Sequence, residues 1–158
     1  MSEASDEPSN ILNFEQLTDW LGTSGQPDRN QFKAISNAGF EAVINLALPT
    51  SDNAIADEGS IVTGLGMIYY HIPVAFEAPT KDNLTTFITA MRSLESKNVW
   101  VHCVVNARVS AFVYHYLRQE KNFDDKQARS KFLSRWEPKM DRVWLEFMAM
   151  GKKAARSP

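Results

Sequence analysis

Residues 99–110 read VWVHCVVNARVS, and this stretch decides the fold and the candidate site of the chain. Residues 98–102 form a short apolar run that is typical of a buried strand. Residues 103–108 then form a short loop, and an amphipathic helix follows. The apolar face of that helix has offsets of 0, 3, 4, 7 and 8: Val109, Phe112, Val113, Tyr116 and Leu117. We therefore expect Cys103 at the carboxyl end of a parallel strand, where open α/β sheets bind their ligands.

A cysteine between a strand and a helix start has a distinctive chemistry. The first amides of a helix have no partner within the helix, and they lie at the positive end of its dipole. Both effects favour the thiolate of Cys103 over the thiol. The amides of Val104, Val105, Asn106 and Ala107 would bind an anion above the sulfur, and the guanidinium of Arg108 would grip two of its oxygens. This pattern predicts an oxyanion site in which Cys103 is the nucleophile.

Strands and helices alternate on both sides of this stretch. We expect short strands at 11–14 and 20–23, and a helix that Asp28 caps and Gly39 ends. Further strands are expected at 42–46 and 67–74, and a helix that Thr80 caps follows the second of them. From Asp124 onward we expect two helices, broken before Pro138. The fold class is thus α/β, with a largely parallel sheet of about four to five strands flanked by helices.

Length and composition limit the remaining possibilities. The 158 residues suit one domain, expected at 11–150, with a disordered lead-in at 1–10 and a basic tail at 151–158. The net charge of −2 gives no basic field for nucleic acid or a membrane surface. No apolar run reaches the roughly 18 residues of a membrane span. The N-terminus lacks a signal peptide, which favours the cytoplasm if Met1 is native and leaves the periplasm possible for a processed chain.

Cofactor and metal sites are not expected. The single cysteine excludes an internal disulfide and any CxxC site. His71 and His115 have no partner at metal-ligand spacing, and we interpret both as structural.

The sequence resembles a known family at three further places. They are Ser24-Gly25-Gln26-Pro27, the segment from Gly39-Phe40 to Val43-Ile44-Asn45, and Tyr70-His71-Ile72-Pro73-Val74. With the His102-Cys103-xxxx-Arg108 loop, they are similar to the dual-specificity branch of the protein tyrosine phosphatases. The chain resembles more closely the beta-lactamase hydrolase-like phosphatases, a group of mostly bacterial proteins of poorly defined function. The resemblance covers roughly residues 11–120 and implies hydrolysis of a phosphate monoester through a cysteinyl-phosphate.

The loop departs from the tyrosine phosphatase pattern in two ways. It has four residues between Cys103 and Arg108, where those enzymes have five, and this length also resembles the persulfide-holding loop of rhodaneses. It also contains no glycine. Asn106 stands where the glycine would be, and asparagine is the next best residue in the left-handed region.

The general acid is the third departure. Related phosphatases carry an aspartate on the loop after the preceding strand, whereas this loop holds only Glu77. Asp82, just inside the next helix, is the alternative, and the absence of any effective acid is a further one. Two residues have candidate supporting roles. His102 would orient the loop through backbone hydrogen bonds, or it is an ordinary histidine at a strand end. The resemblance implies that the hydroxyl of Ser110 would help the thiolate to depart.

Three functions stay open on the sequence alone. The first is a phosphatase acting on a phosphorylated substrate of unknown type. The second is a rhodanese-like sulfurtransferase that carries a persulfide on Cys103. The third is a catalytically weak module that binds phosphate or a phosphorylated protein. The oligomeric state is also open.

Overall fold

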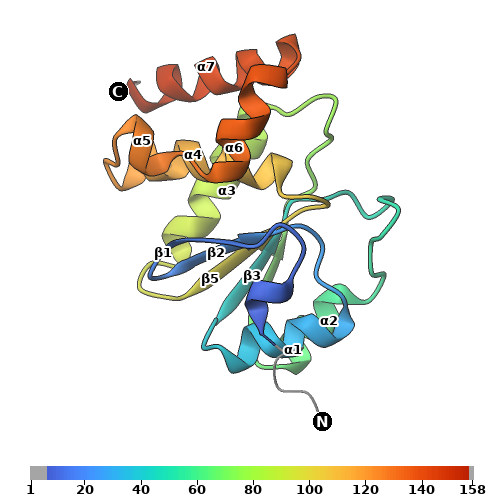
Figure 1. Cartoon of the computed structure of the whole chain (residues 1–158). Helices are drawn as coiled ribbons and strands as arrows, with labels where there is room; N and C mark the ends of the chain where they lie inside the picture. Colours follow the sequence, from blue (N-terminus) through green and yellow to red (C-terminus); the bar gives the residue numbers. More distant parts are fainter. Residues whose placement is uncertain (1–6, 157–158) are drawn as a thin grey trace.

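The computed structural model describes residues 7–156, with side chains through Met150. Its centre is a five-stranded sheet in the order β1-β2-β5-β3-β4 (Figure 1). Strand β1 pairs antiparallel with β2, and the other pairings are parallel. The predicted α/β class with a largely parallel sheet is confirmed. The strands are β1 (Glu15–Thr18), β2 (Leu21–Ser24), β3 (Ala42–Asn45), β4 (Ile68–His71) and β5 (Val99–His102).

Helices cover both faces of this sheet. In Figure 1, α1 and α2 lie on one side, and the helices from α3 onward lie on the other. The α-helices are α1 (Arg29–Asn37), α2 (Glu58–Gly64), α3 (Lys81–Ser93), α4 (Ala107–Glu120), α5 (Asp125–Ala128), α6 (Lys131–Trp136) and α7 (Arg142–Arg156). Two 3₁₀ turns, η2 (Pro8–Asn10) and η3 (Glu137–Lys139), complete the described elements.

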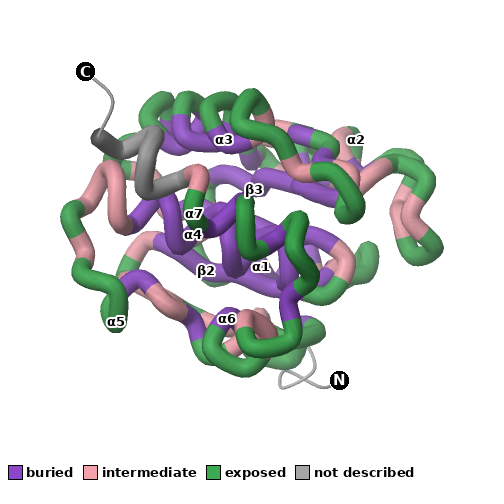
Figure 2. Tube along the Cα trace, turned by 90° about the horizontal axis from the view of Figure 1, so that it is seen from above, coloured by how far each residue is buried: buried purple, intermediate pink, exposed green. Residues whose placement is uncertain are grey.

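The alternation of side chains along the central strands divides the core in two. Val43 and Trp100 face α1 and α2, and they pack with Phe32 and Ile35. Ile44, Val101 and their alternate neighbours face the larger cluster on the other side, which includes Phe87 and Phe112. Figure 2 shows that β2, β3 and most of α4 are buried in the middle of the molecule. A strand that is buried on both faces reads as a continuous apolar run, as residues 42–46 and 98–102 do.

The predicted helix starts are confirmed by their caps. The side chain of Asp28 accepts a hydrogen bond from the amide of Gln31, and the Gln31 side chain accepts one from the amide of Asp28. Thr80 and Asn83 form the same reciprocal pair at the start of α3. These bonds satisfy amides that the first helical turn leaves without partners. Gly39 lies just beyond α1 with a φ of +96°, as the sequence predicts.

The two ends of the chain differ from the sequence-based expectation. The prediction of a strand at 11–14 was wrong, because the edge strand lies at Glu15–Thr18 instead. Ile11 is 2% exposed and belongs to the α1/α2 side of the core, and Phe14 stacks on Trp100 at 5.5 Å. Their apolar character therefore reflects packing in a turn and not strand pairing.

Beyond Asp124 the chain forms α5, α6, η3 and α7, and Pro138 lies within η3. The expectation of two helices there was too simple. Residues 1–6 of the predicted lead-in lie outside the described residues, whereas Pro8–Asn10 form η2. Residues 151–156 of the predicted basic tail belong to α7, which continues to Arg156, and residues 157–158 lie outside the described residues. Among the described helices, none combines the length and the apolar character of a membrane span.

Candidate active site

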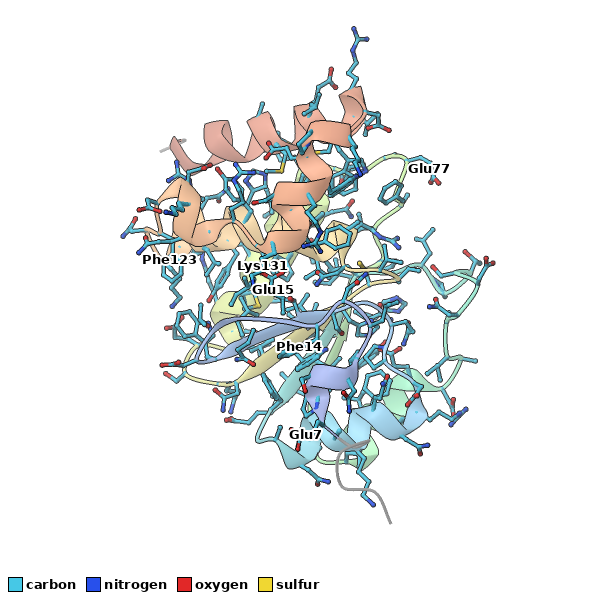
Figure 3. All side chains as sticks on the ribbon, in the orientation of Figure 1. Glu7, Phe14, Glu15, Glu77, Phe123 and Lys131 are labelled. Atoms are coloured by element: carbon cyan, nitrogen blue, oxygen red, sulfur yellow. The ribbon has the colours of Figure 1, made fainter. Side chains whose placement is uncertain are left out.

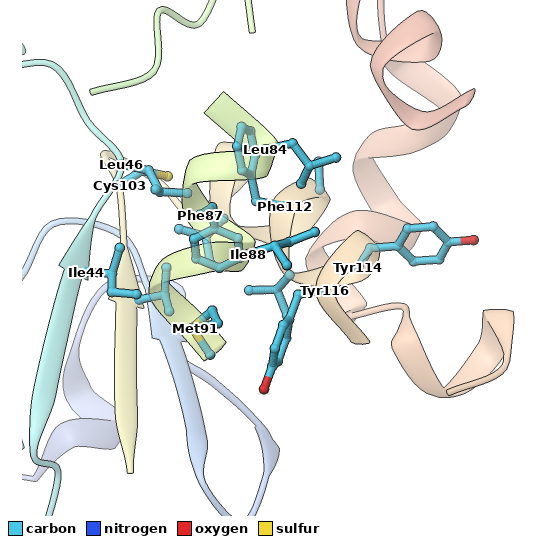
Figure 4. Packing of buried hydrophobic residues seen from close by; sticks show 14 of the residues in the cluster. Ile44, Leu46, Leu84, Phe87, Ile88, Met91, Cys103, Phe112, Tyr114 and Tyr116 are labelled. Carbon is cyan, nitrogen blue, oxygen red and sulfur yellow. The ribbon is translucent and has the colours of Figure 1, made fainter. Parts of the chain in front are cut away.

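The loop after β5 lies at the centre of the sheet. Strand β5 runs between β2 and β3, and its last residue, His102, is level with Ser24 and Asn45. Helix α4 begins at Ala107, after only four intervening residues. Cys103 is fully buried at the strand end, and Figure 4 shows it beside Leu46. The predicted strand, loop and helix are therefore present, with the thiol at the carboxyl end of a parallel strand.

The carbonyl groups of the loop are tied to the surrounding protein. The oxygen of Cys103 is 3.2 Å from His102 Nδ1, and the oxygen of Val104 accepts the amide of Gln26 at 2.9 Å. The oxygen of Val105 accepts Asn13 Nδ2 at 2.8 Å.

The amides of the same loop have no protein acceptor. Within the described part of the chain, no backbone amide from residue 104 to residue 108 donates a hydrogen bond to another residue. Because successive carbonyls of the loop are held by its surroundings, these amides are left to meet a ligand. A curled loop of free amides at a helix start is an anion-binding arrangement.

Asn106 has the backbone conformation that the missing glycine would supply. Its φ is +86°, in the left-handed region. The side chain is buried, and its Nδ2 donates to the carbonyl oxygen of Asn13 at 2.8 Å. This bond fixes Asn106 against the turn before β1, so the residue both turns the loop and anchors it. Val105, one residue earlier, is 41% exposed and forms an apolar part of the rim.

Arg108 is a buried cation that pairs with no carboxylate of the described residues. It is 6% exposed, and its Nη1 donates to the carbonyl oxygen of Val74 at 2.8 Å. Its guanidinium carbon lies 5.8 Å from the ring centroid of Phe76. In the described residues its Nε has no hydrogen-bond partner, and no salt bridge involves Arg108. A buried, incompletely bonded guanidinium is costly by itself, so this arrangement favours an anionic ligand.

The loop between β4 and α3 lies over Arg108 and is held by the C-terminal helices. The carbonyl oxygen of Phe76 accepts Trp144 Nε1 at 2.9 Å. The Phe76 ring packs against Trp144 at 5.4 Å and Trp136 at 6.0 Å. This aromatic cluster, Phe76, Trp136 and Trp144, connects α6 and α7 to the loop that carries Glu77.

The two candidate general acids are both exposed. Glu77 projects outward from its loop in Figure 3, and Asp82 lies in the first turn of α3. In the part of the chain that the structure describes, neither carboxylate has a hydrogen bond or an ion pair. The structure thus places Glu77 on the loop next to Arg108 without directing its side chain into the site.

Ser110 does not present its hydroxyl to the sulfur in this structure. The side chain is buried, and its Oγ donates to the carbonyl oxygen of Ala107 at 2.7 Å. A hydroxyl that bonds back to the preceding helical turn is a common arrangement for serine in helices.

His102 has a buried acidic partner that the sequence did not indicate. Its Nε2 is 2.6 Å from Glu58 Oε2, and the two side chains are 0% and 3% exposed. Gln26 Nε2 donates to the other carboxylate oxygen of Glu58 at 2.9 Å. Burial opposes ionisation of Glu58, but its hydrogen bonds and the charge of His102 outweigh burial and lower the pKa of this carboxyl. In the sequence, the only signal for Glu58 is that apolar residues lie around the polar start of this helix.

The predicted absence of metal ligands stays untested, although no group of metal-binding side chains occurs among the described residues. His71 Nε2 lies 2.7 Å from the carbonyl oxygen of Ala47, and His115 Nε2 lies 3.0 Å from that of Phe147. Both contacts are to backbone, as structural histidines make.

Comparisons with known proteins agree with this fold. No protein-family model and no curated protein matches the chain. Among solved structures, PTPMT1 in complex with PI(5)P has a TM-score of 0.73 at 14% identity, over 90% of this chain and 96% of that one. The catalytic core of the PP-IP phosphatase SIW14 from S. cerevisiae has a TM-score of 0.68 at 14% identity, over 89% and 85%. At this identity they show the fold alone, which is that of the tyrosine phosphatase-like enzymes.

A nearer relative is a Shewanella putrefaciens CN-32 protein described as a "putative phosphatase (DUF442)". It has a TM-score of 0.84 at 32% identity, and the match covers 93% of this chain and 95% of that one. The narrower resemblance to the beta-lactamase hydrolase-like phosphatases stays a prediction. With this identity over nearly the whole of both chains, and with the same phosphatase-like fold, the chain belongs to the DUF442 family.

Proposed function

We propose that the chain is a cysteine-dependent phosphatase that hydrolyses a phosphate monoester through a cysteinyl-phosphate on Cys103. One observation carries this proposal. In the loop from Cys103 to Arg108, the successive carbonyls are bonded to their surroundings, whereas the amides and the Nε of the buried Arg108 have no acceptor among the described residues. Such a loop offers donors and positive charge to the oxygens of one tetrahedral anion.

The arrangement supports a two-step reaction. The Cys103 thiolate attacks phosphorus as the bond to the leaving oxygen breaks, and the loop amides with Arg108 stabilise the equatorial oxygens. A proton goes to the leaving oxygen from a general acid or from water. Water then attacks the cysteinyl-phosphate, the sulfur–phosphorus bond breaks, and the thiolate and inorganic phosphate result.

Glu77 is our candidate for the general acid, with Asp82 as the alternative. The support for Glu77 is its place on the loop whose Val74 and Phe76 contact Arg108. A general acid typically contributes 10²–10⁴-fold. The Glu77→Gln variant should therefore lose activity mainly toward alkyl phosphates, whose leaving groups need a proton, and much less toward p-nitrophenyl phosphate.

The direct test is hydrolysis of p-nitrophenyl phosphate by the wild-type chain. We expect Cys103→Ser to abolish turnover, and Arg108→Ala to reduce kcat/KM by roughly 10²–10³-fold. Arg92→Ala is a matched control, because Arg92 is an exposed arginine that pairs with Glu120 far from the loop in sequence. Wild-type turnover no faster than that of Cys103→Ser would refute the proposal.

A second candidate function is a phosphate-binding module with weak catalysis. The outward Glu77 and the Ser110 hydroxyl bonded to Ala107 favour it, because neither catalytic aid is directed at the sulfur. This function predicts that calorimetry detects phosphate binding that survives Cys103→Ser, with no turnover by either protein.

The six-residue loop also motivates a thiosulfate incubation. A stable gain of one sulfur atom on Cys103, without phosphatase activity, would favour the sulfurtransferase instead.

A further inference from the structure

Glu58 and His102 form a buried pair on the opposite side of the strand end from Arg108. His102 alternates with Cys103 along β5, so its ring points toward α1 and α2, and Phe32 packs edge-on to it at 5.9 Å. Glu58 is the first residue of α2, and it reaches His102 across 44 positions in the sequence. The pair therefore joins α2 to the residue that precedes the nucleophile.

The hydrogen-bond partners of His102 define its protonation. Nδ1 faces the carbonyl oxygen of Cys103 at 3.2 Å, and a carbonyl oxygen can only accept. Nδ1 therefore carries a hydrogen. Nε2 faces a carboxylate oxygen at 2.6 Å, so one proton lies between them, on His102 or on Glu58.

The surroundings of Glu58 assign that proton to His102. Besides its contact with His102, Glu58 accepts a hydrogen bond at Oε1 from the side-chain Nε2 of Gln26 at 2.9 Å. A carboxylate that accepts several hydrogen bonds favours its charged form.

No other charged side chain competes for His102 among its described neighbours. Phe32 of α1, Asn45 of β3 and Gln26 of the segment before α1 are neutral, and Tyr69 of β4 is a neutral hydroxyl. The ionisable groups nearby are Glu58 itself, Cys103 and Arg108. Beside Glu58 in the sequence, Asp57 is exposed and pairs with Arg29 at 2.6 Å.

We propose that Glu58 is a positioning residue that holds His102 as an imidazolium and thereby keeps the Cys103 loop in its anion-binding form. The protonated form of His102 has two effects on the loop. The Nδ1–H of His102 holds the Cys103 carbonyl away from the ligand side of the loop, and the positive ring stands one residue from the sulfur, where it favours the thiolate. Gln26 strengthens the link between Glu58 and the loop. Its side-chain Nε2 donates to Glu58, and its backbone amide donates to the carbonyl oxygen of Val104. The inference rests on the proposed function only in taking Cys103 as the reacting group.

The test measures the thiol and the imidazole directly, without a substrate. In the wild-type chain, NMR of the imidazole nitrogens should show both protonated at neutral pH. The rate of Cys103 alkylation by iodoacetamide, followed against pH, reports the midpoint of thiol ionisation. In Glu58→Gln, His102 should lose its second proton. The midpoint of Cys103 alkylation should rise by about one pH unit, which corresponds to a tenfold smaller thiolate fraction at pH values below the midpoint.

Asp57→Asn is the matched control. This substitution also removes one carboxylate charge, one position earlier in the sequence and at the surface. It should leave the protonation of His102 and the midpoint of Cys103 alkylation unchanged. An unchanged or lower alkylation midpoint in Glu58→Gln would overturn the inference. A neutral His102 in the wild-type spectrum would overturn it even if that variant failed to fold. Because neither readout uses phosphate hydrolysis, a chain without phosphatase activity would refute the proposed function and leave this inference standing.

Discussion

At the scale of single residues, the site depends on groups whose bonding is incomplete. Arg108 is buried with only a carbonyl oxygen and a ring face as partners, and its Nε has none in the described residues. Such a guanidinium is stabilised more by an anion than by the protein that surrounds it. We expect phosphate or a phosphate analogue to raise the melting temperature of the wild-type chain, since the ligand binds the folded state alone.

Gly25 supports the back of the loop, and a methyl group there has no room. A Cβ at this position would lie 2.5 Å from the carbonyl oxygen of Val104 and 3.0 Å from Cα of Val105, both backbone atoms. Gly25→Ala must therefore displace the loop, at a cost of about 1–3 kcal/mol in unfolding free energy. Because misplacing a reacting group by about 1 Å can cost 10²-fold, kcat/KM for an aryl phosphate should fall by about that factor.

Gly64→Ala is the control for this substitution. Gly64 ends α2, and a Cβ there meets nothing within 4 Å. It should raise the unfolding free energy by up to about 1 kcal/mol and leave kcat/KM unchanged. If urea unfolding and kinetics show the two alanine variants to be alike, the loop is not packed as described.

Residues that are adjacent in sequence could be predicted, and residues that meet only in the fold could not. Cys103, Asn106 and Arg108 lie on one turn of chain between a strand and a helix, so local patterns place them. Glu58 follows a polar stretch, where an exposed carboxylate is the usual outcome. Its burial depends on the packing of α2 beside β4, which no local pattern contains.

At the scale of elements, α7 positions the loop that covers Arg108. Trp144 Nε1 donates to the carbonyl oxygen of Phe76, and Val74 on the same loop accepts from Arg108. The sequence predicted a helix after the break at Pro138 but not what that helix holds. The edge strand shows the same limit, because the apolar residues Ile11 and Phe14 lie in a packed turn, whereas the strand itself, Glu15–Thr18, is mostly polar.

Trp144→Phe should loosen this loop. The variant keeps an aromatic ring but loses the hydrogen bond to Phe76, which should cost about 1–3 kcal/mol in unfolding free energy. Amide exchange at Ala78, which donates to Ala75 within the loop, should become faster. We expect kcat/KM to fall by roughly tenfold, because Arg108 loses a fixed partner.

Trp136→Phe separates the hydrogen bond from the ring packing. Trp136 also packs on Phe76, yet it has no hydrogen bond to the loop among the described contacts. This variant should leave the exchange rate of Ala78 nearly unchanged. Equal acceleration in both variants would mean that ring area, and not the Trp144 bond, holds the loop.

At the scale of the whole molecule, the two sides of the sheet contribute different parts of the site. The side of α1 and α2 supplies Glu58, which bonds His102 beneath the loop. The side of α3 to α7 supplies the cover over Arg108 through Phe76 and Trp144. Only the residue order at the end of β5, with His102 and Cys103 on alternate faces, brings both contributions to one loop.

The buried Glu58–His102 pair should make the stability of the whole fold depend on pH in a defined direction. The pKa of Glu58 is lowered in the folded chain from its ordinary value of 4.5, so its contribution to stability is complete above about that pH. The contribution is lost as pH falls from that value through the lower folded value, because the unfolded state takes up a proton on Glu58 before the folded state does. Urea unfolding of the wild-type chain at a series of pH values should show this loss.

Removing the Glu58 carboxylate should remove that part of the pH dependence. At neutral pH, Glu58→Gln should be about 2–4 kcal/mol less stable than wild type, because one partner of a buried pair is left without its counter-charge. The difference between the two proteins should shrink as pH falls below 4.5, because the unfolded wild-type chain then takes up a proton on Glu58 that the folded chain takes up only at lower pH. Asp57→Asn, which changes an exposed carboxylate, should follow the wild-type curve. A constant difference between Glu58→Gln and wild type across this range would show that Glu58 is not ionised in the folded chain.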